Sequence, residues 1–342
     1  MMHDLNTSSV PRYRQLSVAP MLDYTDRLAR YFLRLFARDV GLYSEMVTTS
    51  ALIHGACDRM LRFHDAEQPV ILQLGGSDPR ELALCARMAE EAGYREVNLN
   101  VGCPSDRVQN GRMGACLMAE PQRVAECFAA MQSAVRIPVS IKHRLGIDGR
   151  DRWEELVDFV RWQVEAGCQH LIVHARIAIL HGLSPKENRE IPPLRYEWVY
   201  ALKKQFPLVC IVLNGGIRRV EEVSSHLHQV DGVMIGREAY HNPWILAESA
   251  ARLWAEPLPD REAILEHYRL FMIEELAAGT PLARMSRHIL GLYQGQPGAR
   301  AWRQHLSSGV CRKGAGLEVI DQALSAMRRH QSHELEQATV IH

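Results

Sequence analysis

The sequence lacks several patterns that mark special classes of protein. Its 342 residues include no apolar run long enough to cross a bilayer, so we expect no membrane partner. Residues 1–15 show no basic segment followed by an apolar stretch, so we expect no secretory signal. Lys and Arg total 40, and Asp and Glu also total 40, so the overall charge gives no reason to expect a polyanionic partner. Attraction to nucleic acid would have to come from local clusters of charge.

Paired cysteines are also missing. The eight cysteines lie singly, without Cys-x-x-Cys or the His/Cys spacing that binds zinc. We therefore expect no metal site, no disulfide framework and a reducing, cytoplasmic compartment. No Gly-x-Gly-x-x-Gly segment joins a predicted strand to a predicted helix, which argues against a resident Rossmann-bound dinucleotide.

The pattern that is present is a regular alternation of two kinds of segment. The sequence is 47% hydrophobic and 23% charged, as in a globular protein with a sizeable core. From residue 16 to about residue 250, short apolar runs alternate with longer amphipathic stretches. Eight evenly spaced runs predict an α/β fold, a closed (β/α)₈ TIM barrel, rather than an open sheet. The predicted strands span residues 16–20, 41–47, 70–74, 96–101, 139–142, 170–175, 208–213 and 232–235.

Helix signals separate these runs and then replace them. Pro79 fits the first position of a helix whose end fits Gly93. After about residue 256, strand-like runs stop and apolar residues recur at helical spacing. The length also suits one barrel of about 250 residues with a smaller addition. We therefore expect a flexible N-terminal segment over residues 1–15, a barrel over 16–255 and a helical domain over 256–342.

The predicted strand ends carry the residues of chemical interest, because barrels of this kind place their active sites there. Gly215-Gly216 after strand seven and Gly236-Arg237 after strand eight suit a phosphate. Gln73 offers an amide to a ring edge, and Lys142 offers charge beside a reduced ring. Together these residues favour FMN as a bound cofactor.

Short motifs at these strand ends follow a recognisable order. They are Ala19-Pro-Met21, Asn98-Leu-Asn-Val-Gly-Cys-Pro-Ser105 with Arg107-Val-Gln109, Lys142-His-Arg144, His174-Ala-Arg176, Asn214-Gly-Gly216 and Gly236-Arg237. In order and spacing they resemble the tRNA-dihydrouridine synthases, which saturate the 5,6 double bond of uridine in tRNA. The likeness spans nearly the whole chain. The Arg300-Ala-Trp-Arg303 region and the long C-terminal domain are similar to the synthase A subfamily.

This resemblance implies a TIM barrel, bound FMN, NADPH as reductant, and uridines 20 and 20a of the tRNA D-loop as target. It implies that Cys103 is the proton donor, and that Asn100, Arg144 and Arg176 face the substrate nucleotide. The flavin contacts that it implies are Pro20, Met21, Gln73, Lys142, His174, Asn214, Gly215, Gly216, Gly236 and Arg237.

A thiol suits the chemistry of the proton donor. Hydride transfer from reduced flavin to C6 of uracil leaves negative charge, which an acid must neutralise by protonating C5. An ordinary cysteine, with a pKa of about 8.5, is mostly protonated near neutral pH. Most single cysteines are small buried hydrophobes, which is how we interpret Cys85 and Cys127. Cys103 differs because it follows a predicted strand end, and His174, which could also be a core histidine, is interpreted as a flavin contact for the same reason.

A basic segment suggests how tRNA is held. Residues 281–313 contain six Lys and Arg and no Asp or Glu, whereas an ordinary solvated face has mixed signs. Arg300 and Arg303 would share a helix face, and Lys186 is a further candidate for tRNA contact. Because the target base must leave the RNA stack to enter a barrel, a second surface should hold the remaining RNA.

Two other functions stay open at this point. An FMN barrel that acts on a free small molecule is one, although the acid-free basic segment argues against it. A non-catalytic RNA-binding protein on a barrel scaffold is the other. That protein would have no need of Cys103, Lys142 and the phosphate turns together.

Overall fold

The computed structural model describes residues 10–312 and 314–340, so Lys313 of the basic segment lies outside the described residues. The chain divides into two compact units. One unit combines the described residues up to Arg27 with Asp39–Gly236, and the other combines Leu28–Arg38 with the residues from Arg237 onward. None of the helices described is both long enough and apolar enough to cross a membrane.

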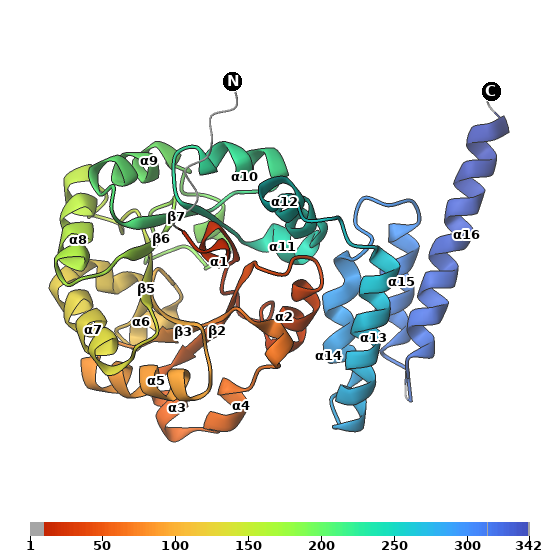
Figure 1. The fold of residues 1–342 in the computed structure, drawn as a ribbon, viewed down its shortest axis with the longest axis horizontal. Helices are drawn as coiled ribbons and strands as arrows, with labels where there is room; N and C mark the ends of the chain where they lie inside the picture. Colours follow the sequence, from red (N-terminus) through yellow and green to blue (C-terminus); the bar gives the residue numbers. More distant parts are fainter. Residues whose placement is uncertain (1–9, 313, 341–342) are drawn as a thin grey trace. The chain divides into compact units, whose positions relative to one another are not determined.

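Eight parallel strands form a closed barrel in the first unit. Each strand pairs with the next along the chain, and β8 pairs with β1, which confirms the predicted barrel. Figure 1 shows the strands surrounded by helices. The strands are β1 (Leu16–Val18), β2 (Gly41–Thr48), β3 (Val70–Gly75), β4 (Glu96–Val101), β5 (Val139–Arg144), β6 (His170–His174), β7 (Cys210–Asn214) and β8 (Gly232–Ile235).

Local sequence signals set the helices between these strands. In α5, the Asp78 side chain accepts from the N–H groups of Arg80 and Glu81, and Pro79 takes the first helical position. Gly93, with φ of 90°, follows the end of this helix, as predicted. The helices and short 3₁₀ turns of this unit are α1 (Arg12–Gln15), α3 (Thr49–His54), α4 (Cys57–Leu61), η1 (Asp65–Glu67), α5 (Pro79–Glu91), α6 (Asp106–Asn110), η2 (Gly114–Ala119), α7 (Pro121–Ala134), α8 (Trp153–Glu165), η3 (Glu187–Arg189), α9 (Tyr196–Gln205) and α10 (Val220–Leu227).

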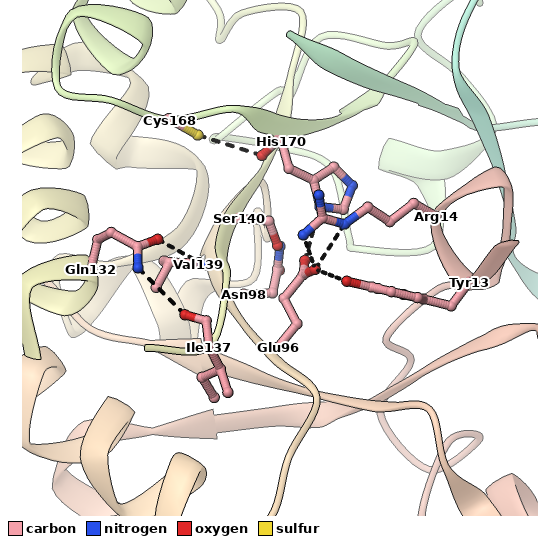
Figure 2. A network of polar contacts seen from close by, with 10 residues as sticks. All are labelled: Tyr13, Arg14, Glu96, Asn98, Gln132, Ile137, Val139, Ser140, Cys168 and His170. Carbon is pink, nitrogen blue, oxygen red and sulfur yellow. Dashed lines mark hydrogen bonds and ion pairs between the residues drawn. The ribbon is translucent and has the colours of Figure 1, made fainter. Parts of the chain in front are cut away.

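A buried ionic network lies at the amino-terminal end of the barrel, beside α1 (Figure 2). Glu96, the first residue of β4, accepts hydrogen bonds from the Tyr13 hydroxyl at 3.1 Å and from Arg14 Nη2 at 2.7 Å. Its other carboxylate oxygen lies 2.9 Å from His170 Nδ1. Burial raises the pKa of Glu96, but His170 and Arg14 outweigh it and lower that pKa to about 2.

Helix α1 lies within residues 1–15, the segment that we expected to be flexible. Arg12–Gln15 are helical and Tyr13 is buried, whereas residues 1–9 lie outside the described residues. A Cβ on Gly41 would lie 2.3 Å from the Tyr13 carbonyl oxygen, and a Cβ on Gly232 would lie 2.0 Å from that of Arg14. The two strand glycines therefore permit the close approach of α1.

The second unit is helical. The rings of Tyr31 in α2 and Phe271 in α13 stack with centroids 3.8 Å apart, and the Tyr268 hydroxyl donates to the Leu28 carbonyl at 3.2 Å. These contacts explain why residues 28–38 group with this unit. The unit begins at Arg237, earlier than the boundary that we expected at residue 255, and so includes α11 and α12. Its elements are α2 (Arg27–Arg34), α11 (Arg237–His241), α12 (Trp244–Trp254), α13 (Arg261–Ala277), α14 (Leu282–Ser286), η4 (Arg287–Gly291), α15 (Ala299–Gly309) and α16 (Glu318–Val340).

Candidate active site

A relay of buried side-chain amides crosses three neighbouring strands. Asn100 Nδ2 on β4 donates to Gln73 Oε1 on β3 at 2.8 Å, and Gln73 Nε2 donates to Asn98 Oδ1 at 2.7 Å. Asn98 Nδ2 then donates to the Ser140 hydroxyl on β5 at 2.9 Å. Each amide fixes the orientation of the next, because an amide oxygen accepts and an amide nitrogen donates. The relay leaves the side-chain oxygen of Asn100 available to the loop that follows β4.

Cys103 lies in that loop, and hydrogen bonds hold the backbone on both sides of it. Asn100 Oδ1 accepts from the N–H groups of Gly102 at 3.1 Å and Cys103 at 3.0 Å. The Cys103 carbonyl accepts from the Ala115 N–H at 2.9 Å. The thiol is half-buried, and its Sγ lies 3.5 Å from the Ser105 hydroxyl oxygen. The loop thus holds its backbone fixed and leaves the thiol as its reactive group.

Arg144, at the end of β5, joins this loop to a second one. Its Nε donates to the Gly102 carbonyl at 2.9 Å. Its Nη1 donates to the carbonyls of Ile177 at 3.0 Å and Asn188 at 2.9 Å, both in segment 177–190 after β6. The Arg144 side chain is buried. It therefore ties two loops together at the carboxyl end of the barrel.

Positive side chains gather at this end. Burial, with a smaller effect of Arg144, lowers the pKa of Lys142 to about 7. Burial likewise lowers the pKa of Arg144 to about 10. The pKa of His174 falls well below its ordinary value because the ring is buried near Arg144 and Lys142. Among the described residues, no carboxylate is a main influence on these three pKa values. Near pH 7, His174 is neutral, whereas Arg144 and part of the Lys142 population carry the positive charge that suits an anionic ligand.

Gly215 and Gly216 follow β7 in conformations that require glycine, with φ of 118° and 76°. A Cβ would lie 2.7 Å from His174 Cδ2 at Gly215 and 2.7 Å from the Tyr196 hydroxyl oxygen at Gly216. Tyr196 also donates to the Gly215 carbonyl at 2.8 Å. Across residues 10–312 and 314–340, no backbone acceptor is found for the N–H groups of these glycines. Such a turn can offer its amides to an anion.

The end of β8 lies beside this turn, because Asn214 Nδ2 donates to the Met234 carbonyl at 2.8 Å. Gly236 follows β8, and a Cβ there would meet no atom within 4 Å. The glycine therefore borders open space rather than packed core. Arg237 begins α11 and groups with the other unit.

Pro20 and Met21 follow β1 in a turn closed by Thr25. The Met21 N–H donates to Thr25 Oγ1 at 2.9 Å, and the Met21 carbonyl accepts from the Thr25 N–H at 3.0 Å. Met21 also packs against the apolar core of the barrel. Both residues are half-buried, so part of each side chain faces solvent.

Segment 177–190 is shaped by a residue that the sequence patterns did not single out. Asn188 is fully buried, accepts from the Ile179 N–H at 2.8 Å and donates to the Ile179 carbonyl at 2.8 Å. Lys186 is exposed on the same segment. Arg176, at the end of β6, donates to the carbonyls of Pro192 and Glu190. No local pattern of sequence distinguishes Asn188 from an ordinary loop asparagine.

Arg300 and Arg303 lie in the helical unit on α15, so the structure does not place them relative to Cys103. The predicted helix is present. Trp302 between them is buried and donates from Nε1 to the Ile289 carbonyl at 3.0 Å. Arg300 is exposed, and half-buried Arg303 donates to Gln294 Oε1 at 2.8 Å.

The predicted residues of the barrel lie at the carboxyl ends of its strands, and two of them also bind the protein backbone. We expected Asn100 and Arg144 to face the substrate nucleotide. Both side chains also bond to the protein: Asn100 to Gln73 and the Cys103 loop, and Arg144 to that loop and segment 177–190. The described residues contain no group of three His, Cys, Asp or Glu side chains placed to hold a metal ion.

The sequence also matches a known protein family. The sequence model of a family described as dihydrouridine synthase matches residues 17–328. The chain belongs to the dihydrouridine synthase family. That match covers both units, from β1 to α16.

Several relatives of this dihydrouridine synthase family protein carry the name tRNA-dihydrouridine(20/20a) synthase. The Pseudomonas putida protein is 54% identical over 332 residues, which cover 95% of this chain and 99% of that protein. The Pseudomonas aeruginosa protein is 57% identical over 317 residues, covering 92% and 95%. The Vibrio cholerae protein is 54% identical over 314 residues, covering 91% and 96%.

A solved structure shares the fold alone. It is a 2-naphthoyl-CoA reductase in complex with 2-naphthoyl-CoA, with a TM-score of 0.51 and 11% sequence identity. The likeness covers 70% of this chain and half of the reductase chain. At that identity, it supports the barrel and carries no argument about chemistry.

Proposed function

We propose that this dihydrouridine synthase family protein is an FMN-dependent tRNA-dihydrouridine(20/20a) synthase that uses NADPH as electron donor. The observation that carries the proposal is the Cys103 thiol, held by its backbone at the carboxyl end of the barrel beside Lys142 and Arg144. The close relatives named for this activity support the same choice over nearly their whole length.

The residues present fit FMN. The Gly215-Gly216 turn offers amide groups, and Gly236 borders open space, so a phosphate has both donors and room. Lys142, with a pKa of about 7, can place charge beside a negative ring system. Gln73 keeps one amide hydrogen beyond its bond to Asn98, which it can donate to a ring edge. Pro20, Met21, His174, Asn214 and Arg237 remain our other proposed flavin contacts.

The chain's own residues then account for the second half of the reaction. Bound FMN, reduced by NADPH, would supply hydride to C6 of the target uracil. Cys103 donates the proton that C5 needs, and its thiol becomes a thiolate. Lys142 and Arg144 lie near Cys103, since its charge raises the pKa of each. Water then returns the proton to Cys103 after the product leaves.

The tRNA is held by more than the barrel. We assign Arg300 and Arg303 on α15 to phosphate contacts, because the helix is present and no ion pair is found for either residue within the described parts of the chain. The helical unit, with residues 256–342 as its main part, would then be the tRNA-binding domain. Lys186 and Arg176 are further candidates near the barrel mouth. Because the substrate is tRNA, we place the reaction in the cytoplasm.

The test is direct reduction of tRNA. The purified protein, NADPH and unmodified tRNA should yield a tRNA heavier by two hydrogen atoms at each of uridines 20 and 20a, located by nuclease digestion and mass spectrometry. The protein should release FMN on denaturation. Reduction of free uridine or another small molecule with no reaction of tRNA would favour the small-molecule barrel, and a colourless protein that binds tRNA without reducing it would favour a scaffold.

A further inference from the structure

Gln109 connects the Cys103 loop to a segment that is distant in the sequence. Its side-chain Nε2 donates to the Pro104 carbonyl at 2.8 Å and to the Leu180 carbonyl at 3.0 Å. An amide nitrogen carries two hydrogens, so it can serve both acceptors at once. One side chain therefore joins the residue after Cys103 to Leu180 in segment 177–190, 71 residues further along the chain from Gln109.

The Leu180 acceptor is itself held in place. Its N–H group donates to Asp148 Oδ1 at 2.8 Å, so both the N–H and the carbonyl of this residue are hydrogen-bonded. Asn188 fixes the same segment through the backbone of Ile179. Segment 177–190 is therefore a firm anchor for the loop that carries Cys103.

The outer half of the Cys103 loop is held by tertiary contacts rather than by its own secondary structure, and buried Val108 is one of these contacts. Pro104 has no N–H to donate, and α6, which follows, has only the five residues Asp106–Asn110. Ser105 precedes this helix without a side-chain capping bond. So short a helix is not stable in isolation, because nucleation is costly and few bonds repay it. Tertiary contacts must hold this part of the loop.

We propose that Gln109 is a positioning residue. By hydrogen-bonding the loop to segment 177–190, it keeps the Cys103 thiol within reach of its target atom. Asn100 and Arg144 hold the inner side of the loop, at Gly102, and Gln109 holds the outer side, at Pro104. The proposal rests on the role proposed above for Cys103. A proton donor must lie within hydrogen-bond reach of its target atom, and a displacement of about 1 Å can slow a reaction up to about 100-fold.

The test compares Gln109→Ala with a matched control, Gln132→Ala, in the full-length protein carrying its flavin. Gln132 is also half-buried, and it also makes two hydrogen bonds to backbone, to Ile137 and Val139 at the amino-terminal end of the barrel (Figure 2). Gln109→Ala should speed amide hydrogen exchange of residues 102–110 by about tenfold, the effect of losing one or two ordinary hydrogen bonds. Gln132→Ala should leave exchange in that segment unchanged.

Kinetics separate positioning from general damage. At saturating tRNA, single-turnover oxidation of the reduced Gln109→Ala enzyme should be about 10- to 100-fold slower than wild type, with tRNA affinity and reduction by NADPH unchanged. Gln109→Glu should recover part of this rate as the pH falls, since a protonated carboxyl can again donate to one carbonyl while a carboxylate repels both. Gln109→Ala should show no such recovery.

The outcomes distinguish this inference from the proposed function. Unchanged exchange in residues 102–110 of Gln109→Ala would show that the side chain does not hold the loop. Faster exchange with a wild-type rate of tRNA reduction would show that the loop's position does not limit proton transfer, and would also overturn the inference. A wild-type protein that never reduces tRNA would instead overturn the proposed function itself.

Discussion

Arg14 and Glu96 form an ion pair inside the amino-terminal end of the barrel, with 2.7 Å between Nη2 and Oε2 (Figure 2). The Glu96 side chain is fully buried and that of Arg14 is 14% exposed. The pair fastens α1 to β4 across 82 residues of sequence. The same carboxylate accepts from Tyr13 and contacts His170, so its loss would leave several buried polar groups poorly matched.

We therefore expect Glu96→Gln to lower the free energy of unfolding of the barrel by roughly 3–5 kcal/mol, the range for a buried pair that loses one partner. Urea unfolding followed by circular dichroism measures this change. The control is Asp39→Asn, which breaks the exposed pair between Arg12 and Asp39 and should cost less than about 1 kcal/mol. Equal losses in the two variants would show that burial of the Glu96 network adds no stability.

The same network predicts a pH dependence. The pKa of Glu96 is lowered from 4.5 to about 2 in the folded protein. A group with a depressed pKa stabilises the fold fully above its unfolded pKa, and this contribution is lost as the pH falls through the folded value. The difference in stability between wild type and Glu96→Gln should thus be largest above pH 4.5 and shrink by about 3 kcal/mol towards pH 2. A difference that stays constant between pH 6 and about pH 2 would contradict the lowered pKa.

The barrel itself could be predicted because its strands are buried on both faces and read as short continuous apolar runs. Seven of the eight strands begin where the runs begin, whereas β7 begins at Cys210, two residues later than expected. Helix α1 could not be predicted, since four residues carry no periodicity. The residues that position α1 are distant in sequence. Gly41 and Gly232 leave room for its backbone, and Glu96 pairs with Arg14.

The candidate site could be predicted only in part, for a similar reason. The type and position of Cys103 and Lys142 follow from motifs at strand ends. The role of Asn100 does not, because its side-chain oxygen is directed by Gln73 on another strand. Gln109 stood in the recognisable motif, yet its second acceptor, Leu180, comes from a distant loop. The sequence does not show which distant backbone carbonyl a side chain will reach.

The helical unit offers a prediction about tRNA binding. Replacing Arg300 and Arg303 together by Ala should weaken tRNA binding and reduce the slope of log affinity against log salt by about 1 for each phosphate that is no longer neutralised by an arginine. Reduction of the flavin by NADPH should stay unchanged. The matched control replaces Arg269 and Arg328 by Ala, since these arginines of the same unit pair with Asp321 and Glu262.

Titrations at several salt concentrations supply the measurement for these arginines. An unchanged affinity and salt slope in Arg300→Ala/Arg303→Ala would show that the two arginines lie on an ordinary solvated helix face and do not contact phosphate. An equal loss in the control variant would show that general positive charge on the unit, rather than these two positions, attracts the RNA.

The sharpest prediction concerns the thiol. Cys103→Ala should leave flavin binding and reduction by NADPH intact, because the thiol takes part only when the uracil needs a proton. Reduction of tRNA should slow by about 10²–10⁴-fold, the usual contribution of a positioned general acid. Cys103→Ser should resemble Cys103→Ala, because a hydroxyl is a far weaker acid than a thiol. The control is Cys311→Ala, which removes an exposed cysteine on the helical unit.

The decisive measurement is single-turnover oxidation of the reduced enzyme by unmodified tRNA, which isolates the second half-reaction. The Cys103 backbone is held by Asn100 Oδ1 and by the Ala115 N–H rather than through its side chain, so truncating the thiol should not shift the loop. A slow rate in Cys103→Ala would then report lost chemistry rather than lost structure. If that variant oxidises at close to the wild-type rate, the thiol is not the acid. His174 is a poor substitute because burial and nearby cations keep its pKa well below the ordinary value, so a bound water would have to supply the proton.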